Sequence, residues 1–112
     1  MHVDTSRWRN RRRTTNTRYI QRYFHFAENH AQPTSANYQA LNLEHINLLA
    51  AMEQTYQTKQ WDRVSLFMNI LDRYLEVRGY WAERRIRLEQ AASAANLAGH
   101  PVDAAAFDSN LL

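Results

Sequence analysis

Residues 41–99 read LNLEHINLLAAMEQTYQTKQWDRVSLFMNILDRYLEVRGYWAERRIRLEQAASAANLAG, and this segment decides the fold. Apolar side chains recur every three or four positions, as in Val64, Phe67 and Leu71, which is the period of one face of an α-helix. Two short polar turns interrupt the pattern, and each is followed at once by a Trp. We therefore expect three amphipathic helices that follow one another through short turns.

The same pattern continues on both sides of this segment. Gly79 stands where a left-handed residue would end a helix, and Gln32-Pro33 breaks the pattern before the first long helix. The helices are expected over residues 17–31, 36–59, 61–78, 80–98 and from 102 onward. The predicted fold is all-α, built of antiparallel helical hairpins in the manner of an α-solenoid.

The composition excludes several classes of protein. The chain has 112 residues with only 2 Gly, 2 Pro and no Cys, which is enough for one small domain and poor in the turn residues that a sheet protein needs. Without Cys it has no disulfide framework, no thiol nucleophile and no Cys-ligated zinc. No apolar run reaches the roughly 18 residues of a membrane span, and the first residues lack an apolar secretory core, so a cytoplasmic location is expected.

The charge is distributed unevenly. Residues 1–23 hold seven Arg and one Asp, a net charge of +6, whereas residues 24–112 have a net charge of −3. The basic excess therefore belongs to the N-terminal region and not to the domain as a whole. We expect residues 1–16 to form a basic flexible tail and residues 17–112 to form one helical domain.

Part of the chain resembles a tetratricopeptide repeat. Residues 79–85 are similar to the turn and the start of the second helix of such a repeat, and Met68 and Leu71 match the inward face of its first helix. Asp72 and Arg84 depart from the pattern, since small residues are usual at both positions. The resemblance implies a helical array that works by binding other proteins.

A longer resemblance adds a context. Residues 22–28, 43–52, 60–61 and 78–84 are similar to the helical segment that follows the winged helix in STAND NTPases of the NB-ARC type, including bacterial transcriptional regulators. It covers residues 17–112, and it implies the opening segment of a tetratricopeptide array that acts as a sensor in signal transduction. The sequence contains no G-x-x-x-x-G-K-S/T phosphate-binding loop, so we expect no nucleotide and no other cofactor.

Six residues are predicted to form the packing and interaction set of these helices. The aromatic members at the helix starts are expected to be buried anchors, with a hot spot on a partner surface as the alternative. The set is Tyr56, Trp61, Met68, Leu71, Trp81 and Leu88.

The N-terminal cluster of basic residues is a second candidate site. Guanidinium groups pair with phosphates and a Trp can stack on a base, so the cluster suits nucleic acid; the alternative is a solvated tail without a role. Its members are Arg7, Trp8, Arg9, Arg11, Arg12 and Arg13.

Catalytic and metal chemistry find little support in the sequence. His45 stands alone on an apolar stripe, where a core or interface histidine with one hydrogen bond is expected rather than a metal ligand. Glu83 and Glu89 lie among Arg84, Arg85 and Arg87, which is typical of a charged face in solvent. We therefore expect a chain that is not an enzyme and holds no metal.

The sequence thus favours a protein-interaction or scaffold module, which binds a protein partner or a second copy through its helical faces. The alternative is a small nucleic-acid-binding regulator that uses the Arg-rich N-terminal tail. A membrane partner is not expected.

Overall fold

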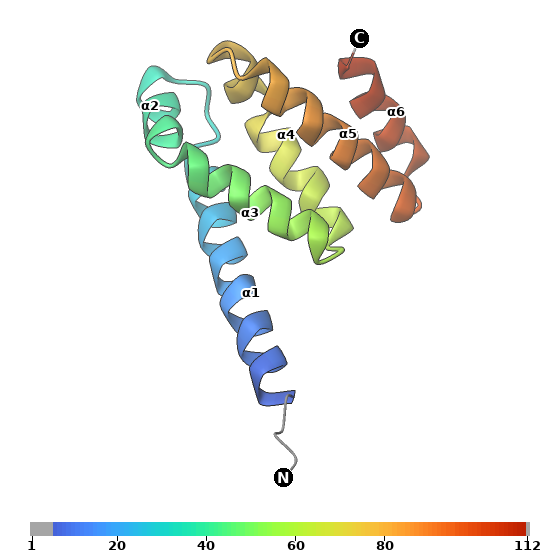
Figure 1. Cartoon of the computed structure of the whole chain (residues 1–112). Coiled ribbons are helices and arrows are strands. Elements are labelled where there is room, and N and C mark those ends of the chain that lie inside the picture. The colour runs from blue at the N-terminus through green and yellow to red at the C-terminus, as the bar shows by residue number, and fades with distance from the viewer. Residues whose placement is uncertain (1–5, 112) are drawn as a thin grey trace.

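The computed structural model describes residues 6–111, with side chains from residue 17 onward. Within these limits it contains six α-helices and no strand, which confirms the predicted all-α class (Figure 1). The helices are α1 (Ser6–Asn29), α2 (Ser35–Leu43), α3 (His45–Gln57), α4 (Trp61–Val77), α5 (Trp81–Leu97) and α6 (Pro101–Asn110).

The predicted single helix over residues 36–59 is wrong, because the chain breaks at Glu44 into α2 and α3. Glu44 has φ −105° and ψ 18°, and its N–H donates to the carbonyl of Leu41 at 3.1 Å, a tighter turn than that of an α-helix. The break lies between Asn42 and His45, which hydrogen-bond to tyrosines far away in the chain. Tertiary contacts therefore override a local pattern that favours a continuous helix.

Helix α1 begins at Ser6 rather than at residue 17. Its C-terminal half packs on α3 and α4 through a buried face, and the ring of Phe24 meets that of Phe67 edge-on at 5.0 Å. The buried residues are Ile20, Tyr23, Phe24 and Ala27. The N-terminal half extends away from the other helices (Figure 1). The side chains of residues 1–16 lie outside the described part of the chain, so the flexible tail stays a prediction.

Three helix ends share one turn, repeated every 20 residues. Lys59, Gly79 and Gly99 all have positive φ, at 61°, 79° and 81°. In each turn the following N–H donates five residues back, at 3.1 Å from Gln60, 2.9 Å from Tyr80 and 2.8 Å from His100. This is the Schellman arrangement that satisfies the last carbonyls of a helix, and it confirms the predicted cap at Gly79.

The core repeats at the same interval as the turns. Leu48, Met68 and Leu88 are fully buried at equivalent positions of α3, α4 and α5. The positions seven residues later are also fully buried; they are Thr55, Leu75 and Ala95. One structural unit, a helix with its turn, is therefore used repeatedly, and each copy covers the apolar face of the one before it.

Consecutive helices pack side by side. Figure 1 shows α4, α5 and α6 as neighbouring helices. Because the turns between them are short, each helix is antiparallel to the one before it. Helix α6 packs on α5, and its buried residues are Ala104 and Phe107. Across residues 6–111, no helix has both the length and the apolar content to cross a bilayer.

Candidate interaction surface

A cluster of four hydrogen-bonded side chains joins the α2–α3 break to the α4–α5 turn. We call it the junction cluster: Asn42, His45, Tyr74 and Tyr80. The Tyr74 and Tyr80 hydroxyls both donate to Asn42 Oδ1, the first at 3.4 Å, and His45 Nδ1 lies 2.9 Å from the Tyr74 oxygen. The imidazole also stacks on the Tyr80 ring, with centroids 3.8 Å apart and planes at 21°.

The Tyr74 hydroxyl has two partners within the junction cluster. Its oxygen lies 2.9 Å from His45 Nδ1 and 3.4 Å from Asn42 Oδ1, so the contact with His45 is the shorter one. An amide oxygen only accepts and each phenol has one proton to give, and the direction of the bond with His45 depends on the tautomer of the imidazole. Burial raises the pKa of Tyr74, and burial lowers the pKa of His45 against a smaller opposing effect of Glu83. Both shifts favour the uncharged forms of these two side chains. The hydrogen bonds and the ring stack hold the four side chains against one another, and the cluster therefore provides a rigid support.

Three exposed apolar side chains border this support. We call them the apolar rim: Leu43, Ile46 and Trp81. They are 80%, 82% and 71% exposed, and each directly follows a member of the junction cluster in the chain. A Trp and two aliphatic side chains held at the edge of a rigid cluster have the composition of an interface anchor.

An open cleft is lined by Tyr38, whose ring contacts Tyr74 of the junction cluster. Its volume is about 510 Å³, and its walls come from the start of α2 and the end of α4. The lining residues are Pro33, Thr34, Ser35, Tyr38, Arg73, Val77 and Arg78. Tyr38 is buried on one side and its ring meets that of Tyr74 at 5.9 Å, so the cleft connects directly to the junction cluster.

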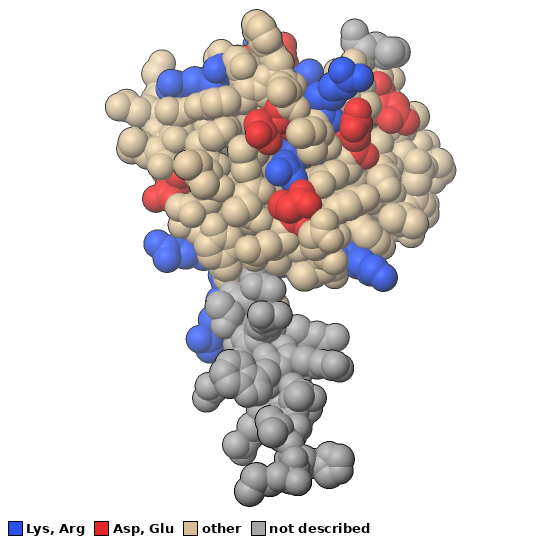
Figure 2. Space-filling view, in the orientation of Figure 1, with Lys and Arg blue, Asp and Glu red and all other residues tan. Residues whose placement is uncertain are grey.

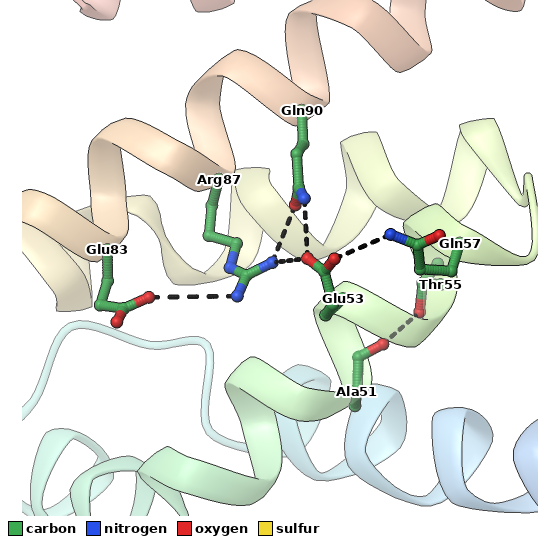
Figure 3. Close-up of polar contacts among 7 residues, drawn as sticks. All are labelled: Ala51, Glu53, Thr55, Gln57, Glu83, Arg87 and Gln90. Atoms are coloured by element: carbon green, nitrogen blue, oxygen red, sulfur yellow. Dashed lines mark hydrogen bonds and ion pairs between the residues drawn. The ribbon is translucent and has the colours of Figure 1, made fainter.

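A second polar junction holds α3 and α5 together (Figure 3). Glu53 of α3 accepts hydrogen bonds from Arg87 and, at 2.7 Å, from Gln90 of α5, and Gln57 donates to it at 3.0 Å. These bonds, that of Gln90 foremost, lower the pKa of Glu53 to about 2. The Arg87 guanidinium also lies 4.0 Å from Glu83. Figure 2 shows acidic and basic side chains interspersed on this face.

Arg87 was expected on a charged face in solvent, together with Glu83, Arg84, Arg85 and Glu89, and for Arg87 that expectation is wrong. Arg87 is only 9% exposed, because it occupies the position that Phe67 and Phe107 hold in the neighbouring helices. Arg84 likewise is mostly covered, and its Nε donates to Asp72 at 2.6 Å. The two departures from the tetratricopeptide pattern, at 72 and 84, therefore compensate each other as an ion pair.

The predicted packing set divides into three groups. Met68, Leu71 and Leu88 are fully buried, so they belong to the core and cannot contact a partner. Tyr56 and Trp61 are partly buried and pack on the core, with their rings edge-on at 5.6 Å.

The expected burial of Trp81 is wrong. Trp61 and Trp81 both open a helix after the same turn, but Trp61 rests on Tyr56 whereas the equivalent residue before Trp81 is Glu76. An exposed carboxylate offers no ring to pack on, and Trp81 therefore stays 71% exposed.

Sequence reasoning missed Asn42 as the shared acceptor of the junction cluster. Its partners lie 32 and 38 residues away, so no local spacing could reveal it. His45 was anticipated as a core or interface histidine with one hydrogen bond, and the contact with Tyr74 confirms the hydrogen bond. The arginine cluster, Arg7 to Arg13, lies where side chains are not described.

Comparison with known proteins adds no identity. No protein-family model matches the chain, and neither a curated protein nor a solved structure matches it. Within the described residues, His, Asp and Glu form no group of three that could hold a metal ion.

Proposed function

We propose that this chain is a protein-interaction module that acts without catalysis, and that the apolar rim is its contact surface. The observation that carries the proposal is the 71% exposure of Trp81, which follows Tyr80 of the junction cluster in the chain as Leu43 follows Asn42 and Ile46 follows His45. Large apolar side chains in water are costly, and a Trp fixed next to a hydrogen-bonded cluster loses little conformational entropy when it is covered.

The junction cluster supports a binding role for the apolar rim, because it holds the exposed side chains in place. The junction cluster anchors all three rim residues through their neighbours in the chain, so the rim is preorganised. The cleft of about 510 Å³, which is lined by Tyr38 next to Tyr74 of the junction cluster, offers a partner a recess. Interfaces commonly combine a central aromatic anchor with a polar edge, and Arg73 and Arg78 supply such an edge here.

The proposed context is the opening segment of a tetratricopeptide-like sensor array in a STAND-type signalling protein, located in the cytoplasm. The resemblance of residues 17–112 to that segment supports it. In such an array the partner is another protein or the next part of the same helical stack.

The experiment compares two pairs of exposed apolar residues. The double variant Ile46→Ser/Trp81→Ala removes two of the three side chains of the apolar rim. The control variant Leu97→Ser/Val102→Ser removes a matched pair near the α5–α6 turn, 61% and 80% exposed. Partner capture from a lysate of the source organism is quantified for both variants and the wild-type chain, after thermal melts establish that all three are folded.

The rim variant is expected to lose at least about tenfold in captured partner, since an aromatic anchor contributes 2 kcal/mol or more at an interface. The matched variant is expected to capture as much as the wild type. Equal capture by all three chains would refute the apolar rim as the contact surface.

A further inference from the structure

A second open cleft lies between the α3–α4 turn and the C-terminal end of α5. Its volume is about 570 Å³, within the range of about 300–1,000 Å³ that is typical of small-molecule sites. We call it the lysine cleft, and its lining includes Lys59, Trp61, Asp62, Arg63, Leu66 and Ala98. None of these residues belongs to the junction cluster or the apolar rim, so the proposed protein contact leaves the lysine cleft without a function.

Lys59 has a backbone conformation that is strained for any residue with a side chain. Its φ is 61°, in the left-handed region, where Cβ comes too close to the following carbonyl oxygen. The equivalent positions of the next two turns are Gly79 and Gly99, so the same turn forms with glycine and does not require a lysine. A strained residue in the lining of a cleft indicates that its side chain has a function there.

The lysine is also unusual in the composition of the chain, and its turn is well fixed. Of the 14 Lys and Arg residues in the sequence, Lys59 is the only Lys. Gln60 Nε2 donates to Thr58 Oγ1 at 2.8 Å, and the Thr58 hydroxyl donates to the carbonyl of Gln54, also at 2.8 Å. These bonds hold the backbone of the turn, while the flexible lysine stem allows the ammonium group to follow a ligand.

The lysine cleft has an excess of positive charge. Among the side chains that the structure describes, no carboxylate forms an ion pair with Lys59 or Arg63. The Arg63 guanidinium lies 5.2 Å from the ring centroid of Phe24 in α1, a cation–π contact that limits its conformations. Asp62 is the acidic residue of the lining; its side chain is 82% exposed and lies 3.6 Å from His100. Two positive charges and one negative charge leave an excess of one positive charge.

The charge and the apolar part of the lining together indicate the class of ligand. One excess positive charge matches a single carboxylate, whereas a phosphomonoester, with a charge of about −1.5 to −2 at pH 7, would exceed it beside Asp62. A guanidinium and an ammonium group both form strong charge-assisted hydrogen bonds to a carboxylate. The other lining side chains, Trp61, Leu66 and Ala98, are apolar, and Leu66 is 51% exposed. A ligand that covers them needs an apolar group next to its carboxylate.

We propose that the lysine cleft binds a small hydrophobic carboxylic acid in its ionised form. Lys59 and Arg63 hold the carboxylate, and Trp61 and Leu66 contact the apolar group. The strain at Lys59 lowers the stability of the turn, but the lysine supplies a cation that glycine could not. This site goes beyond the proposed protein contact and does not depend on it.

The test titrates sodium phenylacetate into the ¹⁵N-labelled chain at constant ionic strength and follows the backbone amide signals by NMR. Phenylacetamide has nearly the same size and shape without the charge and is the neutral probe, and phenyl phosphate is the probe with the larger charge. The variants Lys59→Gly and Arg63→Gln each remove one cation from the lysine cleft. The control Arg73→Gln removes an exposed arginine of α4 that lines the other cleft.

Phenylacetate is expected to shift the amide signals of residues 59–66 and 98, with a Kd on the order of 1 to 10 mM for a ligand of this size. Lys59→Gly and Arg63→Gln are each expected to weaken binding at least about fivefold, because each removes a charged donor. Lys59→Gly also relieves the strain at φ 61°, so thermal melts should show it to be no less stable than the wild type, and unfolding then cannot explain its loss of binding. Arg73→Gln is expected to bind within about twofold of the wild type.

Five results would overturn the proposal. They are no shift of these signals, equally tight binding of phenylacetamide, wild-type affinity in Lys59→Gly, equal weakening by Arg73→Gln and Lys59→Gly, or tighter binding of phenyl phosphate at the same signals. The fourth would show that only the overall charge of the chain matters, and the fifth that the site prefers a phosphate. The apolar rim is unchanged in all of these variants, so its function is tested separately.

Discussion

The first turns of α4 and α5 have the same local structure, but the Trp that begins each helix differs in burial. Each follows a Schellman turn, at Lys59 and at Gly79, and each begins with a Trp. Trp61 packs on the core, and Trp81 is 71% exposed. The difference arises five residues upstream, where α3 offers a Tyr ring and α4 offers a carboxylate. The Trp at the start of the helix thus stabilises the fold in α4, whereas in α5 it is exposed and can contact a partner.

Removing Tyr56, the aromatic partner of Trp61, should have the largest effect on stability. Tyr56→Ala takes away the ring on which Trp61 rests, at a centroid distance of 5.6 Å, and we expect it to lower the free energy of unfolding by about 2 kcal/mol. Glu76→Ala, at the equivalent position before Trp81, is expected to change it by less than about 0.5 kcal/mol. Urea unfolding of both variants measures the contrast, and similar losses in the two would contradict it.

The two turns differ in the residue that adopts the left-handed conformation. Gly79→Ala places a side chain at φ 79° with no neighbour within 4 Å, so conformational strain alone should destabilise the protein by about 1 to 2 kcal/mol. Lys59→Gly relieves the same strain at φ 61° and is expected to stabilise it by about 0.5 kcal/mol. Thermal melts that show the same sign for both substitutions would disprove this reading of the turns.

The polar contact between α3 and α5 is expected to make the stability of the fold depend on pH. The pKa of Glu53 is held at about 2 by its hydrogen bonds, below the value of about 4.3 expected in the unfolded chain. A lowered carboxyl pKa stabilises the folded state above the unfolded value, and this stabilisation is lost as the pH falls from about 5 toward 2.

Glu53→Gln removes this contribution. Because Glu53 is 40% exposed, solvent screening keeps it below about 1 kcal/mol. The gap in melting temperature between the wild type and Glu53→Gln is therefore expected to be largest near neutral pH and to close as the pH falls toward 2. A gap that stays constant over this range would show that the carboxylate charge contributes nothing.

Introducing at position 76 the aromatic partner that Trp81 lacks is expected to have a small stabilising effect. Glu76→Tyr gives Trp81 the aromatic neighbour that Trp61 has, and should stabilise the fold by about 0.5 to 1 kcal/mol. In a background with Trp8→Phe and Trp61→Phe, the emission of Trp81 should shift to shorter wavelength as its ring is covered. Unchanged emission would mean that residue 76 does not control the exposure of Trp81.

Local patterns in the sequence predict much of the fold. The 3–4 spacing of Val64, Phe67 and Leu71 predicted α4 to within a residue of its bounds, and Gly79 identified the cap that follows. These features depend on neighbours in the same helix, which a sequence displays directly. The break at Glu44 could not be found in this way, because it is determined by hydrogen bonds that Asn42 and His45 make to α4 and the turn after it.

The candidate site was less predictable for the same reason. Arg87 looked like a surface residue, since its acidic partner Glu53 is 34 positions away. Trp81 looked like a buried anchor, since its equivalence to Trp61 is visible in the sequence. That Glu76 stands where Tyr56 supports Trp61 becomes clear only when the two turns are aligned in the structure. Charged and aromatic residues are readily seen in a sequence, whereas their exposure depends on which side chains of other helices pack against them.

The most direct test of the division of roles is equilibrium urea unfolding of Trp61→Ala and Trp81→Ala beside the wild-type chain. Trp61→Ala is expected to lose about 2 kcal/mol of unfolding free energy and Trp81→Ala less than about 0.5 kcal/mol, because only the first ring is packed. A loss from Trp81→Ala as large as that from Trp61→Ala would show that Trp81 is part of the folded core, and the apolar rim would then have no anchor to offer a partner.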